Sequence, residues 1–126
     1  MIIQPVTSIA DGIGRALAAL CAIGAAYAFI AAFALDVAPE AGWLALWQKW
    51  GFAMFAALFA LLALRPRASA GLWELAFFHK AIIGLAGLTS PFIPGAVQAG
   101  MIDFVLALIL ALAYVLTKGW TAWRRA

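Results

Sequence analysis

The chain has 126 residues, of which 68% are hydrophobic and only 10% carry a charge. A soluble domain is about half apolar and about a quarter charged, so this composition excludes a water-soluble fold and makes lipid the expected solvent. The net charge of +3 falls at the ends of apolar segments, which indicates membrane orientation and no nucleic-acid partner. The length allows one domain, residues 1–126, and the single cysteine excludes an intrachain disulfide and a Cys-based metal site.

The first predicted helix covers residues 9–35, with a membrane span at 14–35. Ser8 is the expected N-cap, because Asp11 follows it at capping-box spacing. The apolar run is too long for the hydrophobic part of a signal peptide, so we interpret it as a retained span. Gly24 and its neighbours Ala25 and Ala28 form a small-residue face suited to close helix packing.

The second predicted helix covers residues 42–64, with a span at 44–64. Trp43, Trp47 and Trp50 recur on one face near its start. This stripe is typical of the aromatic belt that proteins place at a membrane interface. An alternative interpretation is a flat platform for the ring of a lipid or a quinone.

The third predicted helix covers residues 71–88, with a span at 71–89, and is apolar except for Glu74, His79 and Lys80. Ionisable groups at membrane depth are costly and indicate either a structural pair or a functional site. Glu74 is shallow enough to pair with a basic residue at the inner interface, and Arg15, Arg65 and Lys118 are the expected candidates.

Lys80 is predicted to face the interior of the protein near the membrane midplane. It shares one helical face with Ala76, Gly84 and Gly87, where small residues let a neighbouring helix approach. Its expected partner is Asp103 on the fourth predicted helix, residues 97–117, and Lys49 is expected to compete for the same carboxylate.

His79 points about 100° away from Lys80 around the helix axis. We expect it to donate or accept a hydrogen bond to another helix. A metal or haem role is disfavoured, because the chain has one histidine and no cysteine pair. The sequence thus predicts no metal, no cofactor and no catalytic residue.

The charged residues divide between the two ends of the predicted helices. Six basic residues fall at one end: Arg15, Arg65, Arg67, Lys118, Arg124 and Arg125. Asp36 and Glu40 fall at the other end. The positive-inside rule then places both termini in the cytoplasm, with Trp73, Trp120 and Trp123 as an inner aromatic belt. The predicted fold is all-α, a four-helix transmembrane bundle that runs up-down-up-down in the bacterial inner membrane.

Four hydrophobic helices in a chain of this length, with both termini inside and a few charges near helix ends, resemble the DoxX-like group of small membrane proteins. The resemblance covers the whole chain at the level of this pattern. It implies an accessory subunit, in some cases linked to quinone or redox systems.

Three functions are compatible with this pattern. The first is a non-enzymatic accessory or scaffold protein that acts through contacts with lipids and with other helices, as a homo-oligomer or in a larger membrane complex. The second is a dimeric, proton-coupled transporter with a buried Lys80/Asp103 site. The third is a quinone- or lipid-binding redox subunit. The candidate binding residues are Lys80, Asp103, His79, Glu74, Lys49, Trp47 and Trp50.

Overall fold

The computed structural model describes residues 8–125 and contains helices and no strand within that range. The elements are α1 (Ile9–Ala32), the 3-10 helix η1 (Pro39–Ala41), α2 (Gly42–Leu64), α3 (Leu72–Leu88), α4 (Ala96–Thr117) and the 3-10 helix η2 (Gly119–Arg125). The predicted positions of the last three long helices are confirmed to within one residue. Residues 1–7 and 126, which the single-domain prediction also covers, lie outside the described range.

Helix α1 begins where the sequence predicts and ends three residues earlier. Ser8 caps it, since its Oγ accepts a hydrogen bond from the Asp11 amide at 3.0 Å. Beyond Ala32 the backbone tightens into turns closed over three residues, such as the bond from Ala34 N to Ala31 O at 3.1 Å. The apolar run continues to Leu35, so hydropathy gives no signal for this end.

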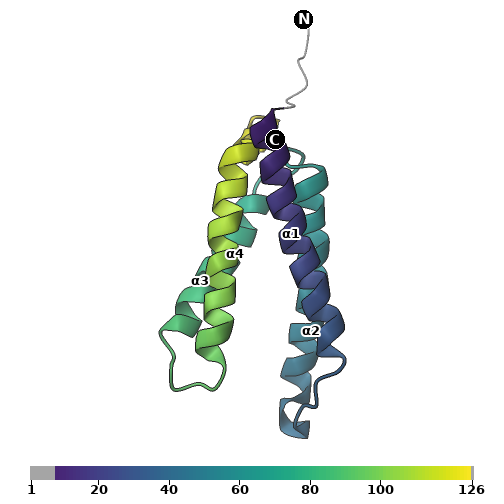
Figure 1. Ribbon diagram of the computed structural model, residues 1–126, viewed down its shortest axis with the longest axis vertical. Helices are drawn as coiled ribbons and strands as arrows, with labels where there is room; N and C mark the ends of the chain where they lie inside the picture. Colours follow the sequence, from purple (N-terminus) through teal and green to yellow (C-terminus); the bar gives the residue numbers. More distant parts are fainter. Residues whose placement is uncertain (1–7, 126) are drawn as a thin grey trace, which may run out of the picture.

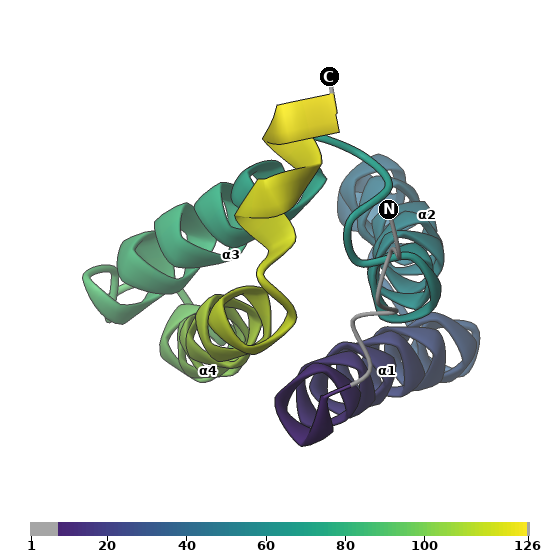
Figure 2. The same cartoon turned by 90° about the horizontal axis from the view of Figure 1, so that it is seen from above.

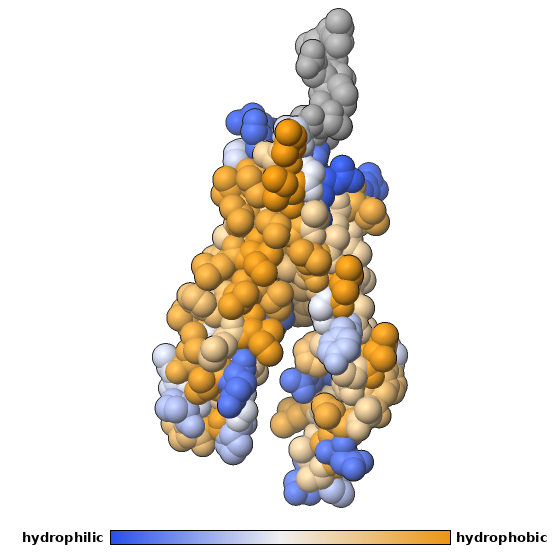
Figure 3. Space-filling view, viewed as in Figure 1, coloured by the Kyte–Doolittle hydropathy of each residue, from blue (hydrophilic) through white to orange (hydrophobic). Residues whose placement is uncertain are grey.

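Three segments are long and apolar enough to cross a membrane: Ile9–Ala32, Pro39–Leu64 and Ala96–Thr117. Helix α3 is shorter, with 17 residues. Apolar side chains dominate the face of the molecule that Figure 3 shows, and all four long helices carry exposed large apolar side chains. The chain is therefore compatible with an integral membrane protein.

The long helices form two antiparallel hairpins, α1–α2 and α3–α4, which pack against each other through α1 and α4. The hairpins meet at the end that carries both termini and diverge toward the other end, so that the molecule has the outline of an inverted V (Figure 1). Seen along the long axis, α2 and α3 lie on the same side of this pair, α2 next to α1 and α3 next to α4 (Figure 2). The predicted bundle is therefore packed at one end and open at the other.

The contact between α1 and α4 depends on small residues. A Cβ added to Gly14 would lie only 2.6 Å from the Thr117 methyl carbon, so glycine sets the closeness of this crossing. Ala18 and Cys21 are buried on the same face of α1. The prediction that Gly24 belongs to the contact face was wrong, because it is exposed and a Cβ there would meet nothing within 4 Å. Small residues permit close helix packing, but a helix with small residues on several faces does not reveal from its sequence which face packs.

Helices α3 and α4 also approach each other closely, here backbone against backbone. A Cβ added to Gly84 would lie 2.8 Å from the Phe104 backbone nitrogen, and one added to Gly100 would lie 2.7 Å from that of Leu88. Ala76 and Lys80 are buried on the same side of α3 as Gly84. The predicted inward face of α3 is confirmed, and it brings Lys80 beside α4.

The closed end of the V contains the core and a polar network. Buried side chains there come from all four long helices and include Phe59, Leu62, Trp73 and Leu110. Trp73 is 1% exposed and donates its indole N–H to the Pro66 carbonyl at 2.7 Å. It is thus a core residue that holds the α2–α3 connection, and its assignment to an interfacial belt was wrong.

Candidate functional site

A cleft of about 720 Å³ lies between the two hairpins. In the space-filling view the hairpins are separated by an open gap at the end away from the termini (Figure 3). The lining residues come from α2, α3 and α4: Trp43, Leu46, Trp47, Gln48, Trp50, Gly51, Phe52, Met54, Phe55, His79, Lys80, Ile83 and Asp103. Ligand sites commonly have volumes of about 300–1,000 Å³ and combine apolar walls with a few polar groups, as this cleft does.

Lys80 and Asp103 form an ion pair that borders the cleft. The Lys80 ammonium lies 3.4 Å from Asp103 Oδ1, and the two side chains are 8% and 18% exposed. The predicted pairing is confirmed, and the glycine packing of α3 on α4 explains why the two side chains can meet. A carboxylate has about four acceptor sites and an ammonium three donors, so the pair keeps hydrogen-bonding capacity for a ligand or water.

Phe55 on α2 connects the two hairpins at this level. Its ring centroid lies 4.0 Å from the Lys80 ammonium, in a cation–π contact, and 4.7 Å from the centroid of the His79 ring. His79 therefore does reach α2, but through ring packing and not through the expected hydrogen bond. Phe55 was missed as a site residue. Its spacing of four from Phe59 marks a buried face of α2, yet nothing in the sequence indicates which residues that face meets.

The tryptophan stripe forms one wall of the cleft. Trp43, Trp47 and Trp50 are 69%, 67% and 58% exposed, and all three line the cavity. Trp43 and Trp47 meet edge to face with centroids 6.5 Å apart, and Trp50 packs on Phe29 of α1 at 5.2 Å. These exposed ring faces could stack on a flat or hydrocarbon ligand.

Lys49 does not join the Lys80–Asp103 pair. Its ammonium lies 4.3 Å from the Phe33 ring centroid, beyond the end of α1, and the residue is not among those that line the cleft. The expected competition for Asp103 was wrong. The two hairpins diverge toward the open end, so α2, which carries Lys49, lies apart from α4, which carries Asp103.

Glu74 has partners other than those predicted. Its Oε1 accepts hydrogen bonds from the Tyr114 hydroxyl at 2.7 Å and from the Trp123 indole N–H at 2.9 Å. Within the part of the chain that the structure describes, no cation forms an ion pair with it. The expected contact with Arg15, Arg65 or Lys118 was therefore wrong. Glu74 does not line the cleft, and its two hydrogen bonds tie α3 to α4 and η2.

The described residues contain no group of three His, Cys, Asp or Glu side chains that could hold a metal ion. The cleft instead offers an ion pair of zero net charge, an imidazole and an aromatic wall. This set can bind a molecule with a neutral polar head and an apolar body.

Comparisons with known protein families, with curated proteins and with solved structures find no match to this chain.

Proposed function

We propose that this chain is a non-enzymatic integral membrane protein of accessory type, located in the bacterial inner membrane. All four long helices cross the bilayer up-down-up-down, with both termini in the cytoplasm. Three segments of sufficient length and apolarity support this proposal. The positions of Arg15, Arg65, Arg67 and Lys118 also support it, because they lie in or next to helix ends that Figure 1 shows at the end carrying the termini. Helix α3, at about 25 Å, lies at the short limit for a span and is covered on one side by α4.

The open cleft is the proposed binding site for a neutral amphiphile of the lipid or quinone class. Asp103 would repel a strongly anionic headgroup, and Lys80 would repel a cationic one. The zero net charge of the pair therefore favours an uncharged headgroup such as a hydroxyl or a carbonyl. The tryptophan wall suits a ring or a hydrocarbon chain beside that head.

The observation that carries this proposal is the ion pair at the border of a cavity between the two hairpins. Without a bound ligand, the cleft in a bilayer would fill with lipid hydrocarbon, which solvates a charged pair poorly. A polar head seated beside the pair satisfies its remaining donors and acceptors, while the tail of the same molecule replaces bulk lipid.

A matched pair of glycine substitutions tests the site. Gly51 lines the cleft and Gly24 lies on the outer face of α1, and a Cβ at either position would meet nothing within 4 Å. Gly51→Phe should therefore fill the cleft, whereas Gly24→Phe should only add surface. The probe is decylubiquinone, whose binding quenches tryptophan fluorescence, with a short-chain diacylglycerol as a competitor.

We expect saturable quenching in the wild type and in Gly24→Phe, and its loss in Gly51→Phe. Displacement by diacylglycerol assigns the site to neutral lipids in general, and a lack of displacement assigns it to quinones. Equal, non-saturable quenching in all three proteins would reflect partitioning into the detergent and would refute the cleft as a binding site.

A second candidate is a proton-coupled carrier that acts as a dimer. The observation in its favour is that the cleft reaches Lys80 and Asp103, two groups able to exchange protons. Proteoliposomes distinguish the two functions: a carrier supports a proton flux that Asp103→Asn abolishes, while an accessory protein supports none.

A further inference from the structure

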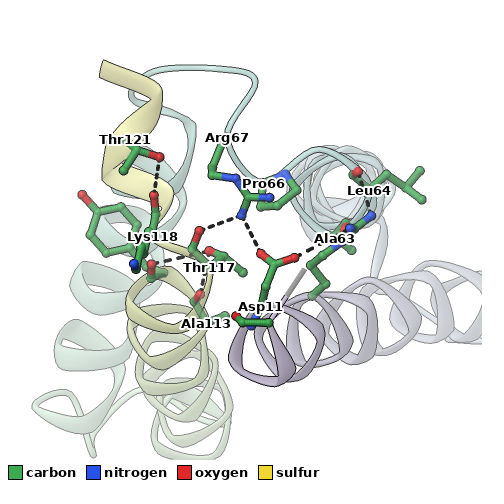
Figure 4. A network of polar contacts seen from close by, with 12 residues as sticks. Asp11, Ala63, Leu64, Pro66, Arg67, Ala113, Thr117, Lys118 and Thr121 are labelled. Atoms are coloured by element: carbon green, nitrogen blue, oxygen red, sulfur yellow. Dashed lines mark hydrogen bonds and ion pairs between the residues drawn. The ribbon is translucent and has the colours of Figure 1, made fainter. Parts of the chain in front are cut away.

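The closed end of the V contains a second cavity, distinct from the cleft. It has a volume of about 380 Å³ and is lined by Arg15, Leu64, Arg65, Pro66, Arg67 and Ala68. We call this cavity the arginine notch. It lies where α1, the end of α2 and the α2–α3 connection meet, at the end of the molecule that carries the termini (Figure 4).

Arg67 holds the notch in place by joining the two hairpins. Its Nη1 bonds to Asp11 on α1 and to the Thr117 carbonyl of α4 at 2.8 Å, and Figure 4 shows its guanidinium between the two helices. Asp11 is 3% exposed, and its other carboxylate oxygen lies 3.8 Å from Arg15 Nη1, so this one carboxylate is shared by two of the three arginines that line the notch.

Arg15 covers the carbonyl end of α2. It donates from Nε to the Ala63 carbonyl at 2.7 Å and from Nη2 to the Leu64 carbonyl at 3.1 Å. The C-terminus of a helix repels anions because its carbonyls carry partial negative charge. The positive charge of Arg15 offsets the negative potential of these carbonyls, and its side chain remains 41% exposed.

Arg65 is the residue whose cationic group is left for a ligand. Its backbone amide closes the last turn of α2 by bonding to the Leu61 carbonyl at 2.8 Å, and its side chain is exposed. Among the described residues its guanidinium has no hydrogen bond or ion pair. Three guanidinium groups against one carboxylate leave an excess of two positive charges around the notch.

We propose that the arginine notch binds the phosphate group of an anionic membrane phospholipid. A guanidinium offers planar, forked donors that match phosphate oxygens, and basic pockets between helices on the cytoplasmic side of a membrane suit anionic headgroups. The proposal rests on the membrane insertion and orientation proposed above, but not on any occupant of the cleft. The same chemistry would recognise phosphate in solution, which the test separates.

The test measures lipid binding to the purified full chain by native mass spectrometry. Phosphatidylglycerol is the anionic probe and phosphatidylcholine the zwitterionic one, added to the wild type and to Arg65→Gln. Arg124→Gln is the matched control, since Arg124 is an exposed residue of η2 that lies outside the notch and carries the same charge. Arg65→Lys keeps the positive charge but removes the planar, forked N–H donors of the guanidinium.

We expect the wild type to prefer phosphatidylglycerol, and Arg65→Gln to weaken that binding about tenfold, the effect of losing one charge-assisted contact. Arg65→Lys should be intermediate, and Arg124→Gln should stay within about twofold of the wild type. All variants should unfold at the wild-type temperature, because neither substituted side chain makes an internal hydrogen bond among the described residues.

Three results would overturn the proposal. Equal weakening by Arg65→Gln and Arg124→Gln would mean that diffuse charge, and not the notch, attracts the lipid. Equal binding of the two lipids to the wild type would exclude selection for an anionic headgroup. Displacement of phosphatidylglycerol by millimolar inorganic phosphate would assign the notch to a soluble ligand. Gly51→Phe, which blocks only the cleft, should leave lipid binding at the notch unchanged, so the two proposals fail separately.

Discussion

Lys80 is held by two contacts of different kinds. Its ammonium lies 3.4 Å from a carboxylate oxygen of Asp103 and 4.0 Å from the centre of the Phe55 ring. Neither contact uses all of its three donors, and the long ion-pair distance leaves room for a polar group beside it. At the scale of single residues, the pair is both a link between α3 and α4 and the polar border of the cleft.

A double-mutant cycle tests the energetic coupling of this pair. Lys80→Met or Asp103→Leu alone should lower the free energy of unfolding by about 2 kcal/mol or more, because each leaves an uncompensated charge with little access to solvent. The double substitution should recover part of that loss, since no charge then remains. The measurement is unfolding in detergent, followed by circular dichroism. A double mutant no more stable than the worse single would show that the two side chains are not coupled.

At the scale of elements, glycine determines which helices pack closely. Gly84 and Gly100 let the backbones of α3 and α4 approach, and Gly14 does the same for α1 and α4. Gly24 is also a glycine in a long apolar helix, but a Cβ added there would meet nothing within 4 Å. Whether a glycine allows two helices to pack closely therefore depends on whether it faces a neighbouring helix.

A pair of alanine substitutions measures that difference. Gly84→Ala forces a methyl group to within 2.8 Å of the Phe104 backbone, so α3 must shift, and we expect a loss of about 1–3 kcal/mol. Gly24→Ala adds a methyl group in open space and improves helix propensity, so it should cause no loss. Thermal unfolding in the same detergent compares the two. Equal stability of both variants would mean that α3 and α4 are not packed this closely.

At the scale of the whole molecule, the two hairpins are joined at one end and open at the other. The joint consists of the α1–α4 crossing and of the bonds that Arg67 makes to Asp11 and Thr117. The opposite end contains the cleft mouth, with Trp43 and Trp47 on its α2 side. An occupant of the proposed site could enter between the separated ends of the hairpins without unfolding a helix.

The orientation of the chain gives a prediction at this scale. Reporters fused after residue 126 should be active on the cytoplasmic side, and reporters inserted between residues 36 and 40 should be active on the periplasmic side. The reason is that the basic residues gather at the joined end and Asp36 and Glu40 at the open one. An active periplasmic reporter at the C-terminus would reverse the orientation and would place the arginine notch in the outer leaflet.

Local patterns in the sequence were sufficient to predict most of the elements. Apolar runs between Pro, Gly and charged segments marked α2, α3 and α4 to within one residue, and the spacing of Ser8 and Asp11 marked the start of α1. The pairing of Lys80 with Asp103 was also predictable. A lysine on a small-residue face needs a partner, and the sequence offers one acid at a suitable depth.

Only the tertiary structure decided which faces meet and which stay apart. Several helices have small or apolar residues on more than one side, so composition cannot distinguish the buried Gly14 from the exposed Gly24. The partners of Glu74 are a phenol and an indole, which a search for opposite charge does not consider. The cleft exists because α1 and α4 pack together while α2 and α3, which lie on the same side of that pair, stand apart. Sequence periodicity fixes each helix and its apolar faces, but the angle between two hairpins depends on contacts between residues far apart in the chain.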